Sequence, residues 1–220
     1  MSAFTPLPRE GQGEGAPDLA TVLAMFPSPF RRYNKAMPVI NTARMTARQF
    51  LELGQDPPGV RLELVEGGIE VAPSPVPSHS HVVFRLGQML LNHIDEHDLG
   101  KLYGDVDTIF SEHDVRRPDL IYFSNDRLHL VGDKAIEGPP NLCVEIVSPS
   151  SATIDRTVKF ELYERHGVAN YWLIDLQPRT FEAYALKAEQ YERVAFAREE
   201  DHVSAPPFNG LSIPLGRLWA

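Results

Sequence analysis

The chain has 220 residues, of which 43% are hydrophobic, enough for one α/β domain with a substantial core and some peripheral sequence. Its formal net charge of −9 argues against a protein that coats DNA tightly and non-specifically, although it is compatible with local nucleic-acid binding. A single cysteine, Cys143, excludes an internal disulfide framework and a Cys-rich zinc site, and the absence of a membrane-length apolar run or a secretory signal pattern predicts a cytoplasmic protein.

The first forty residues differ in composition from the remainder of the chain. Prolines and glycines punctuate residues 1–40, which favours extended or mobile chain, with one short amphipathic piece at Leu19–Phe26. We therefore expect an N-terminal extension at 1–40, followed by one domain at 41–220.

Within the domain, apolar periodicity and turn residues predict helices and strands in a definite order. In chain order these are a helix at 42–53 with Thr46 as a cap, a hairpin of strands at 61–66 and 69–72 around Gly67-Gly68, a helix from Ser78 that stops near Gly100, strands at 101–110, 120–123 and 142–147, a helix at 155–166 ended by Gly167, and strands at 171–176 and 179–186. This order predicts a mixed sheet with a crossover helix, in the α/β (α+β) class.

The apolar strand at 142–147 carries a carboxylate, Glu145, in its middle. Because side chains alternate along a strand, Glu145 shares a face with Cys143, and covering both faces of the sheet places its charge in a medium of low dielectric constant. An unpaired carboxylate is costly there, so Glu145 requires a cation. The cation is either a metal ion or a side chain, with Lys159 and Arg156 as candidates; a strand at the exposed edge of the sheet is the remaining alternative.

A second carboxylate, Asp119, stands directly before the apolar strand at 120–123. Two carboxylates on neighbouring strands can bind one hard divalent ion such as Mg²⁺, for which Mn²⁺ is a possible substitute. Lys159 shares a helix face with Asp155 and Tyr163 at four-residue spacing. Near the same ion, Lys159 would stabilise negative charge that develops on a phosphate.

These residues, in their order along the chain, resemble the Uma-type restriction endonucleases of the PD-(D/E)XK superfamily. The resemblance is carried by Leu62-Glu-Leu-Val-Glu-Gly-Gly with His79 after it, Arg117-Pro-Asp-Leu-Ile, Pro140-Asn-Leu-Cys-Val-Glu-Ile-Val-Ser-Pro-Ser, Asp155…Lys159…Tyr163 and Gly167-Val-Ala-Asn-Tyr-Trp-Leu-Ile-Asp175. It runs from about Thr46 to Leu215. It implies a restriction-endonuclease-like core, a mixed β-sheet flanked by helices, with an N-terminal β-hairpin.

The resemblance also implies roles for single residues. Asp119 matches the Asp of the PD element and Glu145 the acid of the (D/E)XK element, while Glu63 matches an acidic position of the hairpin and is expected to complete the metal site. The usual lysine two positions after the acid is absent, because Val147 stands there. Lys159, on the following helix, matches the lysine that this family carries at that later position.

Three further residues are expected at the substrate. His79, at the start of a helix, is a candidate for contact with phosphate or for proton transfer, and a capping or surface role is the alternative. Arg117, beside Asp119, is a candidate for phosphate contact or for pairing with acids. Tyr163 belongs to the helix face of Lys159.

Together these residues predict a Mg²⁺-dependent endodeoxyribonuclease in which a metal-activated water hydrolyses a DNA phosphodiester bond. Its catalytic residues would be Asp119, Glu145, Lys159 and Glu63, and no organic cofactor is expected. A homodimer is expected by analogy, because cutting two strands takes two sites. Two alternatives stay open. One is a catalytically inactive nucleic-acid-binding or regulatory module of the same fold. The other is a structural homodimer in which Glu145 and Lys159 form only an ion pair.

Overall fold

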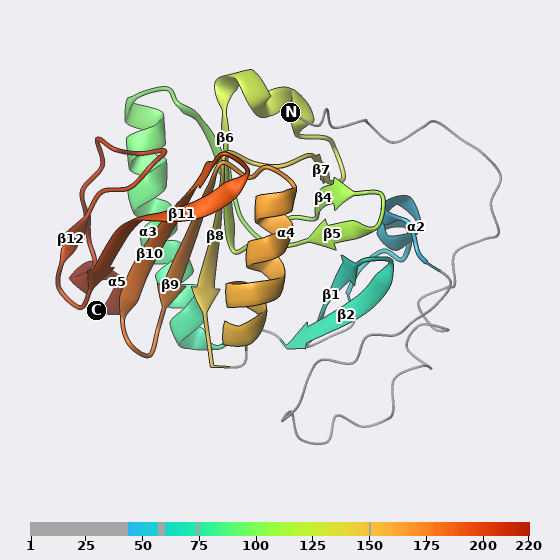
Figure 1. The fold of residues 1–220 in the computed structure, drawn as a ribbon, viewed down its shortest axis with the longest axis horizontal. Coiled ribbons are helices and arrows are strands. Elements are labelled where there is room, and N and C mark those ends of the chain that lie inside the picture. The colour runs from blue at the N-terminus through green and yellow to red at the C-terminus, as the bar shows by residue number, and fades with distance from the viewer. Residues whose placement is uncertain (1–43, 57–59, 74, 150) are drawn as a thin grey trace. The chain divides into compact units, whose positions relative to one another are not determined.

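The structure, a computed structural model, describes residues 44–56, 60–73, 75–149 and 151–220 (Figure 1). The extension expected at 1–40 lies outside the described residues. The chain divides into two compact units, one with residues up to Ser74 together with Asp107–Arg116, and a second with Pro75–Val106 and Arg117–Ala220.

The first unit begins with helix α2, Ala47–Glu52. Thr46 precedes it as the N-cap: its side-chain oxygen accepts a hydrogen bond from the Gln49 backbone N–H, and the Gln49 side chain accepts one from the Thr46 N–H. The predicted helix is therefore wrong at residues 44–46, because an N-cap residue has extended rather than helical backbone geometry, and residues 42–43 of the prediction lie outside the described residues. The predicted capping by Thr46 is confirmed.

The predicted N-terminal hairpin is confirmed as strands β1 (Val60–Val65) and β2 (Gly68–Pro73). Its two loop residues are Glu66 and Gly67, with positive φ angles of 49° and 83°, so the turn lies one residue earlier than the Gly67-Gly68 pair predicted. Two-residue hairpin loops favour such backbone angles because they match the twist of the strands. Strands β4 (Thr108–Ser111) and β5 (Asp114–Arg116) extend this sheet in the order β2-β1-β5-β4.

The second unit opens with helix α3, Pro77–Glu96, which has proline at its first position. Its buried stripe is Val82, Leu86, Leu90 and Ile94, at the predicted helical spacing. The stop predicted at Gly100 is wrong. Asp98 already adopts a left-handed conformation with φ of 49°, and Gly100 opens the next strand.

A six-stranded mixed sheet forms the centre of the second unit. Its strands, in spatial order, are β11 (Gln190–Arg198), β10 (Thr180–Lys187), β9 (Asn170–Asp175), β8 (Leu142–Val147), β6 (Leu120–Ser124) and β3 (Gly100–Tyr103). Only β8 and β9 run parallel, joined by a crossover helix as predicted. The single strand predicted at 101–110 is wrong: Asp105, with φ of 55°, breaks the extended chain, and β4 begins at Thr108.

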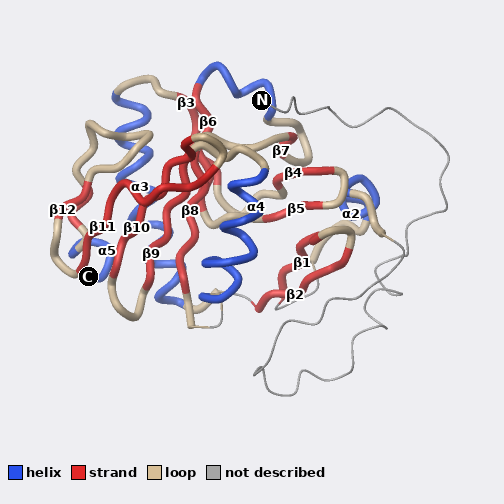
Figure 2. The backbone as a smooth tube through the Cα atoms, in the orientation of Figure 1, coloured by secondary structure: helices blue, strands red, loops and turns tan. Residues whose placement is uncertain are grey.

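The crossover between β8 and β9 begins with a π-helical turn, Ile154–Val158, and continues as α4, Lys159–Arg165. Gly167, with φ of 75°, ends it as predicted. The remaining elements are a 3₁₀ turn at Asn125–Leu130, strands β7 (Ile136–Glu137), β12 (His202–Val203) and β13 (Ile213–Pro214), and helix α5 (Gly216–Trp219) (Figure 2).

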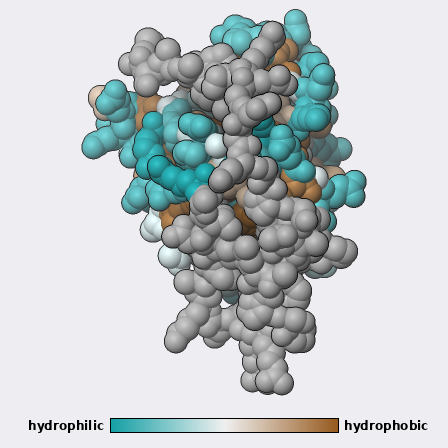
Figure 3. Space-filling model, turned by 90° about the vertical axis from the view of Figure 1, so that its right-hand side faces the viewer, coloured by the Kyte–Doolittle hydropathy of each residue, from teal (hydrophilic) through white to brown (hydrophobic). Residues whose placement is uncertain are grey.

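The alternation of side chains along β8 gives its two faces different partners. Leu142, Val144 and Ile146 pack into the large core with the buried stripe of α3, while Glu145 is hydrogen-bonded to Tyr163 on α4. No helix in the described ranges combines the length and the apolar character needed to cross a membrane. Figure 3 shows a face whose described residues are mainly hydrophilic, with smaller hydrophobic areas between them.

Candidate active site

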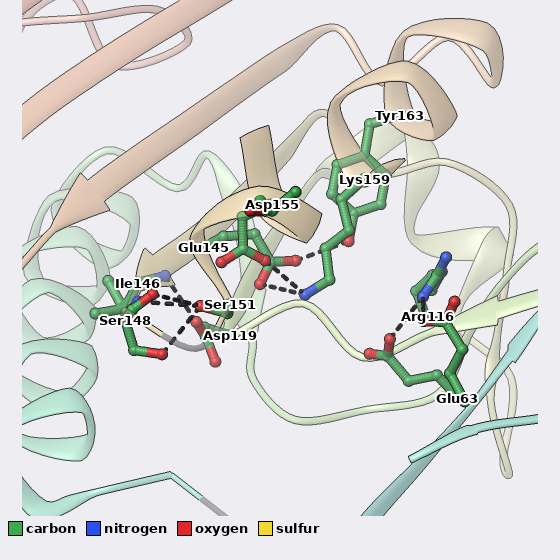
Figure 4. A network of polar contacts seen from close by, with 12 residues as sticks. Glu63, Arg116, Asp119, Glu145, Ile146, Ser148, Ser151, Asp155, Lys159 and Tyr163 are labelled. Carbon is green, nitrogen blue, oxygen red and sulfur yellow. Dashed lines mark hydrogen bonds and ion pairs between the residues drawn. The ribbon is translucent and has the colours of Figure 1, made fainter. Parts of the chain in front are cut away.

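Glu145 is almost completely buried, and both of its carboxylate oxygens have partners on α4 (Figure 4). The Lys159 Nζ lies 2.8 Å from Oε2, and the Tyr163 hydroxyl donates a hydrogen bond to Oε1 over 2.8 Å. The two donors stand one helical turn apart, which is why they reach the same carboxylate. The predicted ion pair between Glu145 and Lys159 is present in the structure.

Lys159 has a second acidic partner, Asp155. Its Nζ lies 3.2 Å from Oδ1 of Asp155, across the π-helical turn, and the Asp155 side chain is itself buried. The Tyr171 hydroxyl donates to the Asp155 backbone carbonyl over 2.9 Å, which ties this turn to β9. Insertions of this kind into α-helices occur often at functional sites. One ammonium group is thus shared by two buried carboxylates.

Asp119 stands at the point where the pairing of β6 with β8 ends. The last paired residues are Leu120 and Val144, so the Ile146 N–H lies beyond the ladder, and it donates to Oδ2 of Asp119 over 2.7 Å. The same oxygen lies 3.0 Å from Nε2 of His79, in the first turns of α3. The other ring nitrogen of His79 is buried and has no hydrogen-bond partner among the described residues.

The electrostatics of the site centre on Glu145. Burial raises the pKa of its carboxyl group to about 8; the Lys159 ammonium acts in the opposite direction, and the charges of Asp119 and Asp155 raise the pKa further. Asp119 and Glu145 are therefore close enough to repel one another electrostatically. The neighbouring Cys143 is a buried free thiol whose pKa burial raises well above its usual value, in keeping with a small core residue.

Glu63, expected as a third metal ligand, has a different environment. It belongs to β1 of the first unit, where its Oε2 lies 2.9 Å from Nη1 of the fully buried Arg116, and Glu70 lies 3.1 Å from the same nitrogen. Among the side chains that the structure describes, no three His, Cys, Asp or Glu residues come together as a metal-binding group. The structure therefore places Asp119 and Glu145 on neighbouring strands of the second unit, with Lys159 paired to Glu145, and Glu63 has its ion pair with Arg116 within the first unit.

The carboxylates of Asp119 and Glu145 fit a divalent metal ion. Asp119 and Glu145 supply the oxygen ligands that Mg²⁺ and Mn²⁺ prefer, and one or two protein carboxylates are usual for Mg²⁺. The pKa of Glu145 is raised because Lys159 only partly offsets its burial and the charges of Asp119 and Asp155. A cation at this place would favour ionised Glu145 and reduce the repulsion from Asp119.

The residues expected at the substrate differ in exposure. Arg117 is half-buried, two residues before Asp119, and His79 is placed against Asp119. Tyr163 is fully buried and its hydroxyl is engaged by Glu145, which favours positioning of the carboxylate over substrate contact. The role of Asp155 as a partner of Lys159 was not assigned from the sequence, although the four-residue spacing indicated that the two share a helix face.

Comparison with known proteins agrees with this architecture. A family described as "Uma2: Putative restriction endonuclease" matches residues 47–216. A crystal structure titled as that of a putative nuclease belonging to DUF820 from Anabaena variabilis is similar in fold, with a TM-score of 0.66 and 23% sequence identity over 80% of this chain and 97% of the other. No curated protein matches the chain.

Proposed function

Since the chain belongs to the Uma2 family of restriction-endonuclease-like proteins, we propose that it is a metal-dependent endonuclease that hydrolyses DNA phosphodiester bonds. The observation that carries the proposal is the buried contact of Lys159 with Glu145 on the strand next to Asp119. Two acids and a lysine in one network are the groups that this chemistry needs.

In this proposal Asp119 and Glu145 hold Mg²⁺ or Mn²⁺. When bound, the ion supplies Lewis-acid polarisation of the phosphate and acidifies a water molecule. Lys159 stabilises the negative charge that develops on the phosphate oxygens, an effect that is strong in a site shielded from water. Arg117 is half-buried beside Asp119 and is our candidate for holding the neighbouring phosphate.

Four neighbours would position these groups. Tyr163 donates to Glu145 and limits rotation of its carboxylate. Asp155 is a second acidic partner of the Lys159 ammonium, so the lysine would keep a partner if Glu145 held a cation. His79 and the Ile146 N–H orient Asp119.

The test is cleavage of supercoiled plasmid DNA with Mg²⁺ or Mn²⁺. We expect Asp119→Asn and Glu145→Gln each to abolish nicking and linearisation. Glu192→Gln is the matched control, because Glu192 forms only an exposed ion pair with Lys187. Circular dichroism should show that all three variants are folded. Cleavage at the wild-type rate in both site variants would sink the proposal.

A second candidate is a module of the same fold that binds nucleic acid without cutting it. It is favoured by the net charge of −9 and because no three His, Cys, Asp or Glu side chains among the described residues form a metal-binding group. It predicts a shift of DNA mobility that needs no divalent metal, and no product in the plasmid assay. The expectation of a homodimer is tested in the same preparations by light scattering.

A further inference from the structure

A groove of about 820 Å³ lies along the outer face of α3, and its other wall is formed by residues 102–105 and the start of β6. All of its lining residues belong to the second unit. Asp119 is one of them. Whatever occupies the groove therefore lies beside Asp119, the residue that carries one of the two carboxylates of the candidate active site.

The helix wall of this groove exposes large apolar side chains. Phe84 is 77% exposed and Leu91 42%, and Leu102 and Tyr103 line the opposite wall. Exposed apolar groups gathered in a groove are typical of a binding surface. A solvent-facing phenylalanine ring suits a flat ligand with an apolar face, such as a nucleobase, because bases stack on aromatic side chains.

The groove wall formed by α3 differs in charge from the rest of the chain. Between Pro77 and Ile94, α3 has no acidic residue, whereas the chain contains 30. Over this stretch the helix carries Arg85 and three histidines, and its first acid is Asp95. In a protein with an acidic net charge, such a segment repels a polyanion less than its surroundings do, although Asp105 and Asp119 also line the groove.

Polar groups on the groove wall also match a nucleotide. Gln88 and Asn92 follow Phe84 at four-residue intervals, are exposed, and line the groove, where their amides can pair with base edges. From His81 to Asn92 the wall is about 16 Å long. The volume lies in the range of small-molecule pockets, about 300–1,000 Å³, which suits single nucleotides and is too small for a double helix.

We propose that this groove binds an unpaired nucleotide of the substrate, with its base stacked on Phe84. The inference rests on the proposed nuclease function and narrows its substrate to nucleic acid with a single-stranded or extrahelical nucleotide beside the cut. The alternative occupant of an apolar helix face is a second copy of this chain. A second copy seated here would fill the space beside Asp119 that the substrate of the proposed site needs, which favours the nucleotide.

The experiment measures binding separately from cleavage. Full-length protein is titrated in EDTA against fluorescein-labelled oligothymidylate of about 15 nucleotides and against a duplex of the same length, with anisotropy as the readout. We expect the single strand to bind more tightly, and Phe84→Ala to weaken it roughly tenfold. Phe84→Trp should retain binding, and its fluorescence should be quenched by the oligonucleotide. Phe196→Ala is the matched control, because Phe196 is 52% exposed on β11 and does not line the groove.

Equal affinity of wild type and Phe84→Ala for oligothymidylate would overturn the inference, as would equal affinity of the wild type for single strand and duplex. If Phe84→Ala turns a dimer into a monomer in light scattering and leaves oligonucleotide binding intact, the groove belongs to a second copy. Phe84-dependent binding without any metal-dependent cleavage would keep the inference and remove the nuclease proposal. If Phe84→Ala cleaves every substrate at the wild-type rate, the nuclease proposal stands and the inference about the groove fails.

Discussion

The Nζ atom of Lys159 lies 2.8 Å from Oε2 of Glu145, and both side chains are buried. Lys159 comes from α4 and Glu145 from β8. Removing one partner of a buried pair leaves the other charge uncompensated, so the stability of the second unit and the chemistry of the site are linked through this contact.

Lys159→Met is expected to lower the free energy of unfolding by about 3–5 kcal/mol, because it leaves buried Asp155, and the ionised fraction of Glu145, without their shared ammonium. Urea denaturation followed by circular dichroism measures the loss. The double variant Glu145→Gln/Lys159→Met should recover much of it. If the single variant is as stable as wild type, the pair contributes nothing to the fold.

The stability of the chain should depend on pH through Glu145. Its folded-state pKa of about 8 is above the usual value, so the fold favours the protonated form. The contribution of Glu145 to stability is therefore complete below its unfolded pKa and is lost as pH rises through about 8. Glu145→Gln should be less sensitive to pH, and more stable relative to wild type at about pH 9 than at about pH 6. A parallel loss of stability in both proteins would contradict this assignment.

Binding of Mg²⁺ or Mn²⁺ should release protons. Glu145 must ionise to act as a ligand, and below a pKa of about 8 most of it is protonated. Calorimetric titration in two buffers of different ionisation enthalpy should report the release, and metal should raise Tm. Both effects should disappear in Asp119→Asn and persist in Glu192→Gln. A metal-dependent rise in Tm that survives in Asp119→Asn and Glu145→Gln would place the metal elsewhere.

Tyr163→Phe should distinguish positioning from substrate contact. Loss of the hydrogen bond to Oε1 removes a donor that favours the ionised carboxylate, so the pKa of Glu145 should rise and the pH profile of cleavage should move to more alkaline values. The cost in stability is expected to be about 1–3 kcal/mol. A raised KM with an unchanged pH profile would instead indicate the substrate contact predicted from the sequence.

Glu63→Gln tests the third proposed metal ligand. The carboxylate is 2.9 Å from the buried Arg116, and we expect the variant to lower stability while metal binding stays as in wild type. Denaturation and the metal-dependent change in Tm, measured on the same preparations, separate the two properties. A lost metal response with unchanged stability would restore Glu63 to the metal site.

Local patterns in the sequence were sufficient for much of the second unit. The strand predicted at 142–147 coincides with β8, because a short continuous apolar run is typical of a buried strand. The face shared by Asp155, Lys159 and Tyr163 follows from helical spacing. β11 was not predicted, since most of its side chains are exposed and the two-residue alternation is missing. The contact between Asp119 and the Ile146 N–H depends on where two strands stop pairing, which no local pattern records.

The segment that contains the π-helical turn ahead of α4 brings together two residues that are far apart along the chain. Lys159 contacts the carboxylate of a residue 14 positions earlier in the chain. A search pattern that requires the acid and the lysine two positions apart would pass over this chain. Chains of this kind are better classified by which side chains are in contact than by the number of residues between those side chains.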